Sequence, residues 1–481
     1  MDDKDFLIFA GPHGTLNKDG KYFSVPKDID DMFDKFQREN SSKITIYFHG
    51  GLVDEENGKQ SAERIAIPIL AANNAPVCFV WKTGFLETIT SSLNSISGTT
   101  LFKRLSIDIA RLAAKHLGFG LVEGRGPGGM PSEEEVALQL SKNKPFDNYS
   151  PKNLPMSRGG ATSIDDLPED EMTLELMITP NAQHLVQNDE LLVIAVESQE
   201  ISITSGRDAG SRGIFSIVKI IKNVVEITIR IIKRFKQKRD HDFYPTLVEE
   251  ILRQFYIAEL GAVIWNEMKV KADEMWHDNA GLSGLDLHTG RYFLDKLAKY
   301  VAHNPDTKIN LIGHSAGTIV ICHMLKAIKQ AGYGIKFNNI IFWAPACRVD
   351  IFNEQIVQAP HLYNGFRCFT MHDLNEKDDV LVPAVYTHSL LYLISGILED
   401  GGHGFDEYIG GMERHIGGNY PYDTEPALLE AHNFIYAAGS NRLVLSPTGL
   451  NAPAGFSTNA LHHGDFHDDP TTINSMKHLI S

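Results

Sequence analysis

The sequence predicts an α/β fold in which helices cover both faces of a mostly parallel central sheet. Three observations support this prediction. Short apolar runs alternate with helical patterns over residues 6–81, and the same alternation returns over residues 285–480. Between an apolar run at 309–312 and a helical run at 318–325 stands the sequence Gly313-His314-Ser315-Ala316-Gly317. A turn of this composition between a strand and a helix lifts a serine above the edge of a sheet.

The N-terminal part is expected to begin with a β-hairpin. Apolar runs at 6–10 and 21–25 flank an Asp-Gly pair, which is typical of a tight hairpin turn. Periodicity then predicts two helices and two buried strands, over residues 28–39 and 60–72 and over residues 43–48 and 77–81.

The middle of the chain breaks the alternation. We expect residues 1–83 and 284–481 to form the core and residues 84–283 to be an inserted cap or lid region, partly helical with mobile loops. A stretch rich in Gly at 124–129 lacks a following Gly-Lys-Ser or Gly-Lys-Thr, so it indicates a connection and not a phosphate loop. The apolar run at 191–196 is compatible with an added strand.

Residues 214–239 combine apolar positions at helical spacing with a basic C-terminal end. This pattern is typical of a helix that lies on an anionic lipid surface, so it predicts a peripheral membrane contact or a lid. The alternative is a helix packed on the rest of the protein with its lysines in water.

Composition excludes several classes of protein. The 481 residues carry 45 basic and 61 acidic side chains, and the net charge of −16 argues against a nucleic-acid binder. The acidic N-terminus does not resemble a signal peptide, and apolar runs are shorter than a membrane span. The four cysteines lie in apolar patterns without paired spacing, which favours reduced thiols and a cytoplasmic protein. The oligomeric state stays open.

Ser315 is the candidate nucleophile. Its glycine neighbours permit the strained turn, and the following helix directs its positive end at the hydroxyl. Gly-x-Ser-x-Gly also arises by chance in glycine-rich loops, but the strand before it and the helix after it favour the catalytic interpretation.

A second motif, His49-Gly50-Gly51, follows the strand expected at 43–48. Together with the serine turn it resembles the lipases and esterases of the α/β-hydrolase superfamily, over about residues 5–82 and 285–480. The resemblance implies an oxyanion hole whose donors are the N–H groups of Ala316 and of Gly51 or Leu52. The residues expected to line the substrate site are His49, Gly50, His314 and Ala344.

The resemblance also places a catalytic histidine between the last strand, expected at 442–445, and the last helix. His463 is the candidate base because its His-Gly-x-Phe context resembles that of the superfamily. His462 and His467 remain alternatives.

The acid is expected in the loop at 372–383, after the strand at 366–371 and before a helix at 383–398. Asp379 is the first candidate because its spacing to the following proline resembles the Asp-x-x-Val-Pro pattern of relatives. Asp378 and Asp373 stay open. Each of these acids could instead be solvated or cap a helix.

The resemblance therefore implies a serine hydrolase that cleaves a carboxylic ester, with a lipid ester as one candidate, through an acyl-enzyme. It implies no metal and no organic cofactor. An amidase, thioesterase or peptidase with the same triad is an alternative. A second alternative is an interaction or regulated effector protein on a hydrolase scaffold, whose insertion binds a partner.

Overall fold

One parallel sheet organises the part of the protein that carries the serine turn. The computed structural model describes residues 3–18, 20–51, 55–81, 85–118, 130–147, 164, 167–197, 217–257, 260, 262–399 and 405–481. Within these residues seven strands form the sheet: β1 (Leu7–Ala10), β2 (Lys43–Phe48), β3 (Ala75–Trp81), β4 (Lys308–His314), β5 (Phe337–Trp343), β6 (Tyr363–Met371) and β7 (Leu443–Ser446). Their order is β1-β3-β2-β4-β5-β6-β7, and every neighbouring pair is parallel. The expected α/β class is confirmed.

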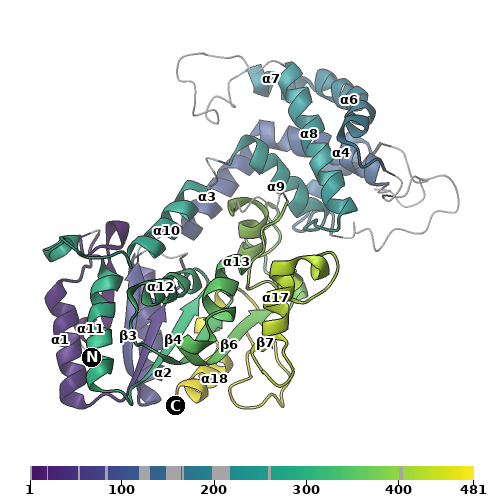
Figure 1. Ribbon diagram of the computed structural model, residues 1–481. Helices are drawn as coiled ribbons and strands as arrows, with labels where there is room; N and C mark the ends of the chain where they lie inside the picture. Colours follow the sequence, from purple (N-terminus) through teal and green to yellow (C-terminus); the bar gives the residue numbers. More distant parts are fainter. Residues whose placement is uncertain are drawn as a thin grey trace. The chain divides into compact units, whose positions relative to one another are not determined.

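Helices cover both faces of this sheet (Figure 1). The covering helices are α1 (Pro26–Glu39), α2 (Glu55–Ala71), α11 (Thr289–His303), α12 (Gly317–Ala331) and α18 (Pro470–Ile480). Successive strand residues point to opposite faces. Tyr47 accordingly packs in the layer beneath α2 and α18, while the ring of Phe48 stacks on that of Phe79, whose ring meets Phe293 of α11 edge to face.

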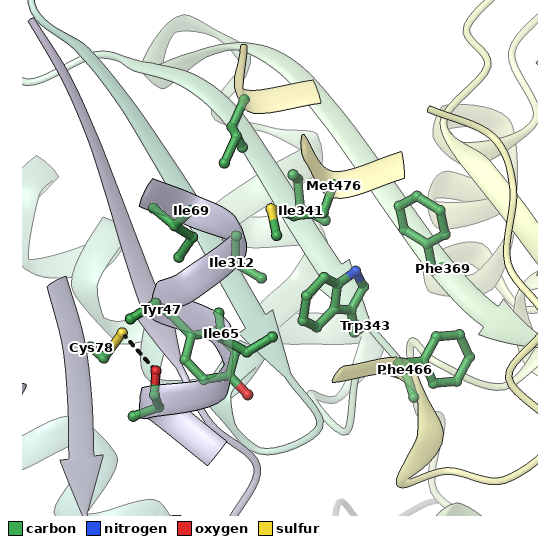
Figure 2. Packing of buried hydrophobic residues seen from close by; sticks show 14 of the residues in the cluster. Tyr47, Ile65, Ile69, Cys78, Ile312, Ile341, Trp343, Phe369, Phe466 and Met476 are labelled. Carbon is green, nitrogen blue, oxygen red and sulfur yellow. Dashed lines mark hydrogen bonds between the residues drawn. The ribbon is translucent and has the colours of Figure 1, made fainter. Parts of the chain in front are cut away.

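The layer between the sheet, α2 and α18 is an apolar core (Figure 2). Tyr47, Ile312 and Trp343 come from neighbouring strands and are fully buried. Ile65 of α2 and Met476 of α18 close over them. Each such side chain contributes roughly 1.5–3 kcal/mol through burial, so this layer fixes the strand ends that carry the loops described below. All four cysteines are buried free thiols, and that of Cys78 donates to the carbonyl of Ala62.

The hairpin expected at the N-terminus is wrong. Strand β1 pairs in parallel with β3, and residues 21–25 are not in a strand. The amides of Lys21 and Tyr22 donate to the carboxylate of Glu55 instead of to a partner strand. A turn signal cannot show that a side chain from a distant helix satisfies these amides.

The chain divides into two compact units. Unit 1 comprises Met1–Glu87, Val263–Asp379 and Tyr408–Ser481. Unit 2 comprises Thr88–Ala262 and Val380–Glu407. Unit 1 contains the whole sheet and its covering helices, together with α10 (Ala262–Glu274), α13 (Val349–Phe352), α14 (Asp373–Asp378), α16 (Glu413–Ile416) and α17 (Pro426–Ile435).

These boundaries differ from the expected insertion at 84–283 in two places. Residues 263–283 belong with the sheet, because Trp276 packs against the rings of Phe48 and Phe79. Residues 380–407 belong with unit 2, because the hydroxyl of Tyr386 donates to Glu249.

Unit 2 is helical in its described residues. Its helices are α4 (Thr100–Leu117), α5 (Glu133–Leu140), α6 (Glu171–Asn188), α7 (Glu190–Glu197), α8 (Ile217–Lys236), α9 (Phe243–Phe255) and α15 (Leu390–Leu393), and α3 (Phe85–Gly98) crosses from unit 1 into unit 2. The strand expected at 191–196 is wrong, since this run forms α7, where Asp189 accepts from the amide of Leu192. The helix expected at 383–398 begins only at Leu390, after a turn in which Ala384 has φ 60°. The glycine-rich stretch at 124–129 lies outside the described residues.

Helix α8 carries most of the segment expected to contact lipid, residues 214–239, of which 214–216 lie outside the described residues. Most of its apolar side chains are buried within unit 2, although Val218 near its start is exposed. Its basic side chains are largely paired with acids, as Arg230 is with Glu250 and Lys233 with Glu171. The apolar stripe of this helix therefore packs on protein and does not form an open lipid-facing surface. None of the described helices has the length and apolar character needed to cross a bilayer.

Candidate active site

The serine turn joins β4 directly to α12. Strand β4 ends at His314 and α12 begins at Gly317, so Ser315 and Ala316 alone make the connection. Ser315 has φ 52°, a left-handed conformation that costs energy for any residue except glycine. A Cβ on Gly317 would lie 2.2 Å from the carbonyl oxygen of Phe48, so the turn needs glycine at this position. This is the geometry that the Gly-x-Ser-x-Gly motif predicted.

Backbone hydrogen bonds from the next strand hold the turn in place. The amide of Ser315 donates to the carbonyl of Trp343 at 2.8 Å, and the amide of Ala346 donates to the carbonyl of Ser315 at 3.2 Å. Ala344 lies between them with φ 42°, and its amide donates to Phe369. The segment after β5 thus fixes the strained serine, whose side chain is buried with the residue only 1% exposed.

His463 lies beside the serine hydroxyl. Its Nε2 is within hydrogen-bond distance of Oγ of Ser315, at 2.8 Å, although the two residues are 148 positions apart in the sequence. Burial, reinforced by the neighbouring ring of His314, lowers the pKa of His463 to about 3. The imidazole is therefore neutral near pH 7 and can accept a proton from the hydroxyl.

The other two histidines considered as the base occupy different positions. His462 is largely exposed, and its Nδ1 bonds Asp379 at 2.9 Å, which raises its pKa. His467 packs against the ring of His314, with ring centroids 5.3 Å apart. Of these three histidines, His463 is the one that forms a hydrogen bond with the hydroxyl of Ser315.

Asp379 reaches the histidine loop through both carboxylate oxygens. Oδ2 accepts from the backbone amide of His463 at 2.7 Å, and Oδ1 bonds the ring of His462. The Nδ1 atom of His463 is buried and has no hydrogen-bond partner among the described residues. The structure thus brings Ser315, His463 and Asp379 together. The carboxylate of Asp379 accepts a hydrogen bond from the backbone amide of His463 and not from its imidazole ring. Catalytic hydrogen bonds of this kind often tighten only when substrate binds.

The two other candidate acids lie on the short helix α14. Asp373 begins this helix, and its amide donates to Glu413. Asp378 ends the helix and is exposed. The hydrogen bonds from this loop to the candidate base come from Asp379.

The expected oxyanion loop lies against the serine turn. A Cβ on Gly50 would be 3.2 Å from that of Ser315, and a Cβ on Gly51 would be 2.7 Å from that of Ala316. The amide of Ala316 donates to no acceptor among the described residues. Gly50 and Gly51 therefore lie against Ser315 and Ala316. Leu52, the other expected donor, lies outside the described residues.

His49 and His314 hold the loops of the site in place and do not face an open substrate pocket. His49 bonds the carbonyl of Gly50 through Nδ1 at 2.6 Å, and its Nε2 accepts from the amide of Trp81 at 3.1 Å. His314 donates from Nε2 to the carbonyl of His463 at 2.9 Å. Burial lowers the pKa of His49 to about 4 and that of His314 to about 3, so both are neutral.

Two features of the site were not predicted from the sequence, namely a contact of Met268 and the grouping of four histidines. Met268 of α10 packs against Gly51, because a Cβ added to Gly51 would lie 2.2 Å from the sulfur of Met268. His49, His314, His463 and His467 form one group, here called the buried histidine cluster, in which burial also lowers the pKa of His467 to about 4. Among the described residues, no three His, Cys, Asp or Glu side chains are arranged to hold a metal ion.

Comparison with known proteins gives one match. The family described as alpha/beta hydrolase of unknown function (DUF900) matches residues 286–377. This stretch contains α11, β4, the serine turn, α12, β5 and β6, but neither His463 nor Gly51. No curated protein and no solved structure matches the chain.

Proposed function

We propose that this chain, whose residues 286–377 match an alpha/beta hydrolase family, hydrolyses carboxylic esters with Ser315 as the nucleophile. One observation carries the proposal. A serine in a strained turn at the end of a central strand lies 2.8 Å from a buried, neutral imidazole nitrogen. Strain, proximity and a neutral base are what a hydroxyl needs to attack a carbonyl carbon.

The reaction proceeds in two halves. His463 takes the proton of Ser315 as Oγ bonds the ester carbonyl carbon, and the protonated imidazole then gives that proton to the leaving alcohol. Water next attacks the acyl-enzyme, with His463 again accepting a proton. The acid leaves and Ser315 regains its hydrogen.

The oxyanion is held by backbone donors. The amide of Ala316, which follows the nucleophile, supplies the first donor, and the amide of Gly51 the second. The support for this assignment is the approach of Gly51 to Ala316 and the lack of another acceptor for the Ala316 amide in the described residues. Two preorganised donors stabilise the charge that forms only in the transition state.

A regulated hydrolase is the second candidate, favoured by the burial of the nucleophile. Ser315 is 1% exposed, so a substrate carbonyl must enter through a conformational opening. This candidate predicts slow labelling of the serine that accelerates when the protein is loosened by mild denaturant or a ligand. Equal labelling rates under both conditions would argue for a site that is open without a trigger.

A fluorophosphonate probe tests the proposed function. The wild type should be labelled covalently, and labelling should vanish in Ser315→Ala and His463→Ala. Hydrolysis of a p-nitrophenyl ester should fall by roughly 10³-fold or more in either variant. Matched controls are Ser91→Ala and His361→Ala, both exposed residues distant from the turn in sequence, which should label like the wild type. Undiminished labelling of Ser315→Ala would refute the assignment.

A further inference from the structure

His314, the residue before the nucleophile, contacts all three loops of the candidate active site. It is the last residue of β4 and is followed directly by Ser315. Its Nε2 donates to the backbone carbonyl of His463 at 2.9 Å. Its Nδ1 lies beside Gly50, since a Cβ added to Gly50 would be 3.5 Å from this nitrogen. The ring of His314 is therefore placed between the loop of the base and the expected oxyanion loop.

The backbone of His463 is held on both sides of its Cα. Its amide donates to Oδ2 of Asp379 at 2.7 Å, and its carbonyl accepts the hydrogen bond from His314. Both distances are in the range of ordinary N–H···O hydrogen bonds. The two bonds fix the peptide groups that flank the Cα, and with them the direction in which the side chain of His463 leaves the backbone.

The imidazole ring of His463 has less support of its own. While Nε2 accepts from the hydroxyl of Ser315, the ring proton is on Nδ1. This Nδ1 is buried and has no hydrogen-bond partner among the described residues. The ring stacks on that of His314, with centroids 5.6 Å apart and planes inclined by 30°. The direction of the base therefore depends on its backbone bonds and on this stack, and His314 contributes to both.

His314 is suited to hold the base because it is buried and neutral. The residue is 5% exposed, and its ring packs on that of His467 with centroids 5.3 Å apart. Burial lowers the pKa of His314 to about 3, so the ring carries a single N–H proton near pH 7. The bond to the carbonyl of His463 requires this proton on Nε2, because a carbonyl oxygen only accepts. The donor is therefore present wherever His314 stays neutral.

We propose that His314 is a positioning residue that orients His463 toward Ser315 through the hydrogen bond to the carbonyl of His463. In a Ser-His-Asp triad, an acid bonded to Nδ1 holds the imidazole in this way. Here the role falls to contacts with the backbone, which His314 shares with Asp379. The ring stack adds to it, but a hydrogen bond is directional whereas stacking tolerates rotation. This role presupposes the proposed function, in which His463 is the base of the reaction.

Two substitutions separate the donor of His314 from its ring. His314→Phe keeps an aromatic ring but removes the N–H group, and kcat for hydrolysis of a p-nitrophenyl ester should fall about 10- to 100-fold, because a small displacement of a reacting group can cost that much. KM should stay within about twofold, since His314 holds the base and not the substrate. His314→Gln keeps an amide N–H near the position of Nε2 and should retain kcat within about threefold of the wild type.

His432→Leu is the matched control. His432 of α17 donates from Nδ1 to the carbonyl of Ile416 at 2.9 Å, so this variant removes the same kind of hydrogen bond elsewhere in unit 1. Its kcat should stay within about twofold of the wild type even where its unfolding midpoint in urea falls. The same urea titration detects a folding defect in His314→Phe, in which case His314→Leu gives the comparison with His314→Gln.

A folded His314→Phe or His314→Leu with the kcat of the wild type would overturn the proposal, as would an equal loss of kcat in His314→Gln. A change confined to KM would do the same, because it would place His314 at the substrate. A wild type that neither hydrolyses the ester nor reacts with the fluorophosphonate would instead refute the proposed function itself.

Discussion

The contacts of single side chains decide the chemistry of the candidate active site. Asp379 bonds the main chain of His463 and the ring of His462, so it fixes the position of the loop that carries the base. In the proposed mechanism, a negative charge so close would also favour the imidazolium formed when His463 takes the proton of Ser315. Asp379 would then act on His463 in two ways, by position and by charge.

Substitutions should distinguish the role of Asp379 from the roles of Asp373 and Asp378. Asp379→Asn keeps the shape but removes the charge, and kcat for ester hydrolysis should fall by on the order of 10² to 10⁴. Asp378→Asn and Asp373→Asn should change kcat by no more than about twofold. Steady-state kinetics of the three variants would check this, and an equal loss in Asp378→Asn would contradict the assignment.

The buried histidine cluster makes stability depend on pH. The pKa values of His314 and His463 are lowered to about 3 and those of His49 and His467 to about 4, against about 6.5 in the unfolded chain. The unfolded state therefore binds protons first, and stability falls as the pH drops from about 6.5 towards 4. Each histidine should cost on the order of 1–2 kcal/mol at pH 5.

Urea unfolding at pH 7.5 and pH 5 measures this dependence. His467→Asn should lose less stability between the two pH values than the wild type does, because one buried titrating group is gone. His361→Asn removes an exposed histidine and should leave the difference unchanged. A difference that is the same in all three proteins would show that the buried histidines do not set it.

At the scale of elements, most strands and helices of the sheet region were predictable from the sequence, whereas two short apolar runs were misassigned. Strand β2 lies where the sequence placed it, because its apolar run is bounded by polar residues and ends at the glycine turn. Residues 21–25 and 191–196 were misassigned for one reason: a short apolar run does not reveal its hydrogen-bond partner. In residues 21–25 the amide of Lys21 bonds the side chain of Glu55. Residues 191–196 form hydrogen bonds within their own helix, α7.

The motifs predicted where the serine and the histidine of the candidate site lie, but not every contact around them. Glycine spacing identified the serine turn, and the position after the last strand identified the histidine loop, because strand order brings both to one edge of the sheet. Spacing to the following proline made Asp379 the first candidate acid, but Asp373 and Asp378 stayed open because all three lie close together in the sequence. The contact between Met268 and Gly51 joins residues with no motif in common.

At the scale of the whole molecule, unit 2 is built around buried charges. Arg234 is fully buried, and its Nη1 lies 2.6 Å from Glu249 and 2.9 Å from Glu250. Arg239 bonds Asp406, so the same network joins the two sequence segments of the unit. Removing one member leaves an uncompensated charge in a low-dielectric interior.

Arg234→Met should therefore destabilise the protein by about 3–5 kcal/mol, because Glu249 and Glu250 lose a buried cation. Lys222→Met on the same helix removes an exposed pair with Glu226 and should cost less than about 1 kcal/mol. Urea titrations of both variants give the two values. Similar midpoints for Arg234→Met and the wild type would show that the network does not contribute to stability.

The discontinuous make-up of unit 2 has a consequence for how the protein is made. Thr88–Ala262 leaves the ribosome before Val380–Glu407 has been translated. At about 5–20 residues per second, the delay is on the order of ten seconds. During that interval the nascent helices lack the contacts of Arg239 with Asp406 and of Glu249 with Tyr386. The yield of native protein should therefore respond to translation speed and to chaperones that hold the growing chain.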